Sequence, residues 1–125
     1  MTITLQGDVF VETCLSRVVL SRIAGKWPLL VIDALGGGAM RNGALLRRIS
    51  GVSQKMLTET LRELEELDLV ERTVLDKVPP HVEYRLTPLG ESLNSVVAEL
   101  DRWVEGNLQQ LGAHSQEPAS APVKG

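Results

Sequence analysis

The chain has few of the side chains from which most chemical sites are built. Its 125 residues include one cysteine, Cys14, and two histidines, His81 and His114, which lie far apart in the sequence. A lone cysteine cannot form a disulfide within a monomer, and a structural zinc site takes about four Cys or His ligands. These shortages exclude an intramolecular disulfide and predict neither a metal site nor a cofactor.

Signatures of catalysis and nucleotide binding are also missing. The chain contains no G-x-S-x-G, no P-loop, no G-x-G-x-x-G and no metalloprotease helix motif. No paired carboxylates or nucleophile–base set stands out, so the sequence predicts that the protein is not an enzyme. Aromatic residues make up only 3% of the chain, which disfavours stacking on single-stranded bases.

Long apolar runs are absent too. No stretch approaches the roughly 18–20 apolar residues of a membrane span. The opening "MTITLQGDVFVETC" has neither the basic start nor the apolar centre of a signal peptide. We therefore expect a cytoplasmic protein without a membrane partner.

The chain does contain a series of amphipathic segments. Apolar residues at helical spacing predict helices over 9–23, 26–35, 42–49, 53–67 and 88–111, and alternating β-branched residues predict strands over 69–75 and 82–87. Thr87 and Pro88 form a cap and a first turn for the last helix. Residues 9–111 are predicted to form one domain, and the polar, proline-containing residues 112–125 a disordered tail.

Charge is segregated along the chain, although the net charge is only −3. Five basic residues and one acid lie from Arg41 to Arg62, whereas residues 63–71 hold five acids and no base. The helix at this boundary, for which Ser53 is a favourable N-cap, has a donor-rich exposed face at its start and an acidic one at its end. Taken alone, this helix could simply present a solvated face of mixed charge.

The order of elements predicts a winged helix-turn-helix, a mainly α fold of the α+β class with a small β-wing. In that fold the helix after the turn lies in the DNA major groove with its first residues against base edges. Gln suits adenine and Lys suits guanine, and the positive end of the helix dipole favours a polyanion. We therefore predict contacts to double-stranded DNA from Arg41, Ser53, Gln54, Lys55, Thr58, Arg62 and, at the wing tip, Lys77.

Three collinear segments resemble the HxlR-type family of bacterial winged-helix regulators. They are "GKWPLLVIDAL" at 25–35, "ISGVSQKMLTETLRELEELDLVER" at 49–72 and "VPPHVEYRLTPLG" at 78–90. The resemblance implies a homodimeric repressor or activator on an inverted-repeat operator. It also implies that Cys14 matches a first-helix cysteine through which some members respond to quinones, aldehydes or oxidants. The chain departs from the family at Asn42, where an aromatic is usual, and at Leu15, where proline often follows the cysteine.

Apolar stripes on the first and last predicted helices exceed what one small domain can cover. We therefore predict a homodimer whose interface includes Val11, Leu15, Val96, Leu100, Trp103, Val104 and Leu108. The alternative is that the last helix folds back on its own core.

Cys14 has two interpretations. Arg17, about one helical turn further on, could favour the thiolate and make Cys14 a redox sensor for a small electrophile. Val11, Leu15 and Val18 crowd the same region, and burial would raise the pKa of the thiol and leave it an inert packing residue. The function has alternatives as well: a winged-helix module that binds protein instead of DNA, or a regulator that senses a non-covalent small ligand.

Overall fold

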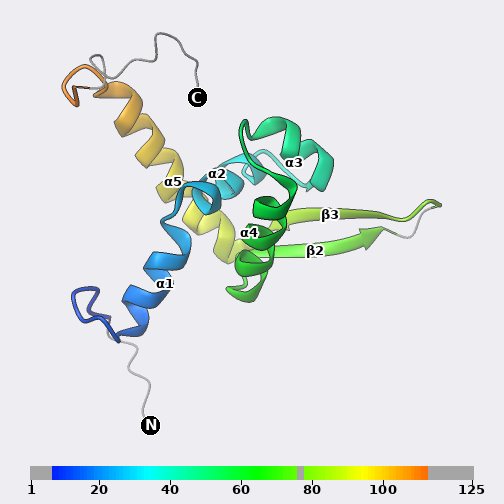
Figure 1. The fold of residues 1–125 in the computed structure, drawn as a ribbon, viewed down its shortest axis with the longest axis horizontal. Helices are drawn as coiled ribbons and strands as arrows, with labels where there is room; N and C mark the ends of the chain where they lie inside the picture. The colour runs from blue at the N-terminus through cyan, green and yellow to red at the C-terminus, as the bar shows by residue number, and fades with distance from the viewer. Residues whose placement is uncertain (1–6, 76–77, 113–125) are drawn as a thin grey trace.

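The computed structural model describes residues 7–75 and 78–112. The helices are α1 (Leu15–Ile23), α2 (Lys26–Leu35), α3 (Asn42–Arg48), α4 (Gln54–Glu66) and α5 (Pro88–Gly106). The strands are β1 (Met40–Arg41), β2 (Val70–Leu75) and β3 (His81–Leu86). They follow in the order α1, α2, β1, α3, α4, β2, β3, α5 (Figure 1), which confirms the predicted α+β class.

Helix α2 lies at the centre of the core. Its sequence is apolar on almost every side, and it packs against both α4 and α5. Val31, Ile32 and Leu35 are buried in α2. The opposing side of α4 buries Leu57 and Leu61 together with Leu64 and Thr60. The predicted helical stripe of α4 therefore faces the core, and its polar side faces solvent.

The wing is an antiparallel hairpin that is extended into a small sheet. Strands β2 and β3 pair from Val70 opposite Leu86 to Leu75 opposite His81. Strand β1 pairs with the other edge of β3, so the strand order is β1-β3-β2. The two-residue β1 was not predicted, and it ties the entry of α3 to the wing.

Two predicted helices are longer than the observed ones by more than two residues. The first was placed at 9–23, but α1 begins at Leu15, because residues 8–14 form turns in which the Phe10 N–H donates to Asp8 Oδ1 at 3.0 Å. The last was placed at 88–111, but α5 ends at Gly106. There the Asn107 side chain donates to the Trp103 carbonyl at 2.7 Å, which satisfies a terminal helix group and stops the helix.

The predicted N-cap residues fix the starts of α4 and α5. Ser53 Oγ accepts a hydrogen bond from the Met56 N–H at 3.1 Å at the start of α4. Gly51, in the turn before it, has φ of +91°, which a glycine adopts without strain. Thr87 Oγ1 accepts from the Gly90 N–H at 3.0 Å and donates to the Asp68 carbonyl at 2.6 Å. The start of α5 is thus fastened to the turn that follows α4.

No helix among residues 7–75 and 78–112 is long and apolar enough to cross a lipid bilayer. The predicted tail begins at Gly112, and its remaining residues, 113–125, lie outside the described part of the chain.

We predict that Gly90→Ala strongly destabilises the protein. A Cβ at this position would collide with the Leu69 carbonyl oxygen, so the backbone would have to move. Overpacking of this kind costs about 1–3 kcal/mol. The matched control is Gly106→Ala on the same helix, where a Cβ would meet nothing within 4 Å. Thermal unfolding should show a lower midpoint only for Gly90→Ala, and equal midpoints would contradict the close packing described here.

Candidate nucleic-acid interface and dimer surface

The start of α4 presents a continuous polar face. Gln54, Lys55, Thr58 and Arg62 are all exposed, on the side of the helix opposite to its buried leucines. The Gln54 side chain donates from Nε2 to Thr58 Oγ1 at 2.9 Å. An amide nitrogen carries two hydrogens, so Gln54 keeps one donor and its carbonyl acceptor free. The hydrogen bond therefore orients Gln54 while leaving it able to make a bidentate contact.

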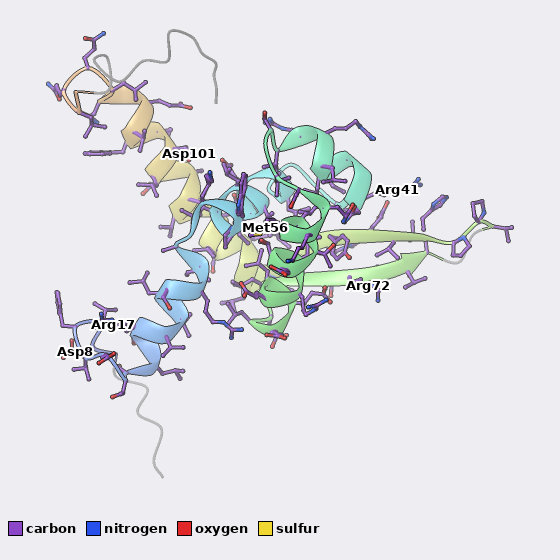
Figure 2. The ribbon with its side chains drawn as sticks, in the orientation of Figure 1. Asp8, Arg17, Arg41, Met56, Arg72 and Asp101 are labelled. Carbon is purple, nitrogen blue, oxygen red and sulfur yellow. The ribbon has the colours of Figure 1, made fainter. Side chains whose placement is uncertain are left out.

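The other residues predicted to contact DNA are Ser53, Arg41 and Lys77. Ser53 caps α4 and is exposed. Arg41 is exposed on β1, where it pairs in register with Glu83 of β3. Lys77 lies outside the described residues. The structure therefore brings Ser53 together with the α4 residues, and it places Arg41 at the stem of the wing (Figure 2).

Arg72 is a further exposed cation near this surface. It lies on β2, opposite Tyr84 of β3, on the strand that leads from α4 toward the wing tip. Figure 2 shows Arg72 and Arg41 near the stem of the wing. Arg72 was absent from the predicted set, because it directly follows the acidic run of residues 63–71. Strand alternation could not have identified it as exposed, because Arg72 lies two residues after the buried Val70 and so on the same face of β2.

Two helices expose apolar faces that nothing in the described chain covers. Helix α1 has no buried residue, and α5 buries only Gly90 and Val97. Figure 1 shows that α1 and the far half of α5 leave the body on the side opposite to the wing. The predicted interface residues are all more than one-third exposed, from Val96 at 62% to Val104 at 38%, with Val11, Leu15, Leu100, Trp103 and Leu108 between them. Helix α5 packs on its own core through Val97 and Leu93, whereas Trp103, Val104 and Leu108 remain exposed in the single copy.

Cys14 lies at the start of α1, where it is the N-cap residue, and not inside the helix as predicted. It is partly exposed, and its Sγ accepts a hydrogen bond from the Asp8 N–H at 3.2 Å. That backbone N–H, followed by the N–H of Ser16, lowers the pKa of the Cys14 thiol, and these contacts outweigh the opposing effect of burial. Arg17 contributes through its backbone N–H, and not through the side-chain charge invoked from the sequence. The thiolate is therefore favoured by backbone amides, first that of Asp8 before the helix and then those of Ser16 and Arg17 in the first turn of α1.

A carboxyl pair joins α2 to α5. A hydrogen bond to Asp101 is the main cause that raises the pKa of Asp33 from 3.8 to about 6. Burial and the negative charges of Asp101 and Glu105 act in the same direction, whereas Arg48 opposes them. The two acids are distant in the sequence, so no local pattern indicated this contact.

A polar hollow of about 710 Å³ lies between the end of α2, β3 and the start of α5. Arg85, Glu91 and Asn94 are among its lining residues. Within the described part of the chain, Asn94 Oδ1 is buried without a hydrogen-bond partner. No group of three or more His, Cys, Asp or Glu residues that could hold a metal ion occurs in the same part.

A three-helix core, a turn with glycine at positive φ, an exposed polar helix face and a β-hairpin define a winged helix-turn-helix protein. A family model for HxlR-like helix-turn-helix proteins matches residues 22–111. The chain belongs to this family. It is an HTH-type transcriptional regulator and not an enzyme, as the sequence predicted.

Relatives of known structure share both the sequence and the fold. The HTH-type transcriptional regulator YtfH of Escherichia coli K12 is 44% identical over 115 residues, which cover 92% of this chain and 91% of YtfH. The solved structure of ytfH from Salmonella typhimurium has a TM-score of 0.80 at 43% identity, covering 90% of this chain and 100% of that one. The redox regulator HypR in its reduced form has a TM-score of 0.72 at 36% identity, covering 78% of this chain and 97% of HypR.

We predict that Asp33→Asn raises the thermal unfolding midpoint at neutral pH. The folded-state pKa of about 6 lies above the ordinary 3.8. Protonated Asp33 therefore stabilises the fold, and this stabilisation is fully present below the ordinary pKa and lost as pH rises through about 6. Asn keeps the donor toward Asp101 without the charge.

The advantage of Asp33→Asn over the wild type should shrink as pH falls from about 6 to the ordinary pKa of 3.8. Unfolding midpoints measured for both proteins across this pH range show directly whether the difference shrinks as pH falls. A difference that does not depend on pH would show that Asp33 does not titrate as described.

Proposed function

We propose that the protein is a homodimer that binds an inverted-repeat operator in double-stranded DNA through α4 and the wing. The observation that carries this proposal is the exposed face of Gln54, Lys55, Thr58 and Arg62 on a helix whose other side is buried core. The acidic residues lie at the opposite end of α4, where they would point away from the phosphates. A module that binds protein alone would have no need for this separation of charge.

Base reading is assigned to the first turn of α4. Gln54, held by Thr58, suits an adenine edge, and Lys55 suits a guanine edge. Arg62, two turns further along, and Lys77 are assigned to phosphates, which position the protein without specifying sequence. Ser53 at the N-cap of α4 and Arg41 on β1 complete the proposed contact set.

We expect Gln54→Ala and Lys55→Ala to reduce sequence discrimination, each by roughly 1–3 kcal/mol. Arg62→Ala should instead weaken binding similarly on all sequences and flatten the salt dependence by about one unit. The measurement is selection of operators from random duplexes, followed by titration of the selected and random DNA at several salt concentrations. Suppose that Gln54→Ala and Lys55→Ala both keep the preferred sequence and its affinity margin over random DNA. This result would show that α4 is not docked in this way.

The dimer is proposed to form through the exposed faces of α1 and α5. Two-fold symmetry would then place two copies of α4 in successive major grooves, roughly 34–36 Å apart. The apolar stripe of α5 and the unburied α1 supply the area, and the wing lies away from both (Figure 1).

Cys14 is proposed as an electrophile or oxidant sensor. Its lowered thiol pKa and partial exposure support reactivity, and the similar HypR is a redox regulator with a reduced and an oxidised form. Figure 2 shows Asp8 and Arg17 at the end of α1 that is remote from Met56 on α4. Modification at Cys14 would therefore act on the separation of the two copies of α4 and not on a DNA contact.

We expect a quinone or a disulfide-forming oxidant to lower the operator affinity of the wild type by roughly 5- to 150-fold. The Cys14→Ser variant should bind the operator equally well with and without the reagent. Titration of selected operator DNA before and after treatment measures both. If the two proteins respond alike, or neither responds, Cys14 is a packing residue.

A non-covalent effector is the second candidate for what triggers release. The feature that favours it is the polar hollow at the junction of the wing and α5, whose lining includes Asn94, a residue with a buried Oδ1 that has no hydrogen-bond partner in the described chain.

A further inference from the structure

One ion pair connects the predicted dimerisation helix to the proposed DNA-reading helix. Arg22, in the last turn of α1, donates to Glu66 Oε1 in the last turn of α4 at 3.0 Å. The side chains are 38% and 55% exposed. Within the described residues, the other ion pair, Glu99 with Arg102 at 3.9 Å, lies within α5. Of the two ion pairs in the described residues, Arg22–Glu66 is therefore the one that joins two separate helices.

Helix α1 has few other attachments to the body of the molecule. It has no buried residue, and its partly buried Ile23 packs at the edge of the core. Ala24 and Gly25 then lead directly into α2. With so little packing, the angle between α1 and the rest of the molecule depends heavily on any polar contact that bridges them.

From this geometry we infer that Arg22–Glu66 is a positioning contact for DNA binding: it sets the angle between the dimerisation helix and the reading helix. The inference rests on the proposed homodimeric DNA-binding function. Helix α4 rises about 1.5 Å per residue, so its reading end lies about 18 Å from Glu66. A rotation of about ten degrees at the α1 joint would move that end by about 3 Å, which is more than a hydrogen bond tolerates.

The expected size of the effect follows from the exposure of the pair. Exposed ion pairs contribute little individually, and a dimer holds two of them, so their loss should weaken operator binding by about two- to thirtyfold. The unfolding temperature should change little, because the same exposure limits the contribution to stability.

A simple electrostatic effect makes a different prediction from a positioning effect. Removing the positive charge of Arg22 would weaken attraction to DNA, whereas removing the negative charge of Glu66 would strengthen it. A positioning contact is lost in both cases. Arg22→Gln and Glu66→Gln should therefore both weaken operator binding if the inference is right.

The experiment measures operator affinity and thermal unfolding for the full chain and its variants. These are Arg22→Gln, Glu66→Gln and the exchange variant Arg22→Glu with Glu66→Arg. Glu99→Gln is the matched control, because it removes an exposed ion pair that lies within one helix. Both single variants should lose affinity, the exchange should restore it, and the control should bind like the wild type.

Several outcomes would overturn the inference. Stronger operator binding by Glu66→Gln would show a purely electrostatic effect. Unchanged operator binding by both single variants would show that the ion pair does not contribute to DNA binding. An exchange variant no better than the single variants would show that the two residues do not act as a pair. If the wild type itself selects no operator, the proposed function fails and the inference falls with it.

Discussion

The burial of α2 between α4 and α5 determines where the other surfaces of the molecule lie. Val31, Ile32 and Leu35 are almost completely removed from solvent, and each such side chain contributes about 1.5–3 kcal/mol. Because α4 packs on α2 through its leucine stripe, its polar side must face outward. Because α5 contacts the core through Leu93 and Val97 and meets α2 again at Asp101, only the end of α5 extends beyond the core. The exposed polar face of α4 and the uncovered apolar surface therefore both follow from the same packing.

The apolar faces of α1 and α5 remain uncovered in a single copy of this small domain. Helix α1 has no buried residue, and α5 leaves Trp103 more than half exposed. Covering these faces with a second copy would bury the apolar area and fix two reading helices relative to each other. Cys14 and Arg22 lie at the two ends of α1, and Asp33 of α2 contacts Asp101 of α5. A change at Cys14, Arg22 or Asp33 would therefore act on the geometry of the proposed dimer.

Much of the fold could be predicted from sequence because its main elements have a clear period. The stripe of α4, the all-round apolar α2 and the alternating wing strands each repeat over several residues. Strand β1 has two residues and therefore no period. The start of α1 was misplaced because the Asp8 side chain binds a nearby backbone N–H and competes with helix formation.

The candidate site was predictable in the same degree. Gln54 and Thr58 are four residues apart on a helix, so their contact follows from helical geometry. The exposure of α4's polar face follows from its period. Arg22–Glu66 and Asp33–Asp101 are contacts between distant segments, and only the packed structure brings them together.

The central claim is that a second copy covers α1 and α5 and places two α4 helices one DNA turn apart. The most direct test is a spin-label distance measured in solution with Glu59→Cys on the exposed side of α4, in a Cys14→Ser background. We expect a single distance of roughly 34–36 Å, broadened by the label arms. This signal should disappear with Trp103→Asp and persist with Val74→Asp, since both side chains are 56% exposed but only Trp103 lies on α5. No dipolar signal at micromolar concentration, or a distance unrelated to the groove spacing, would contradict the account.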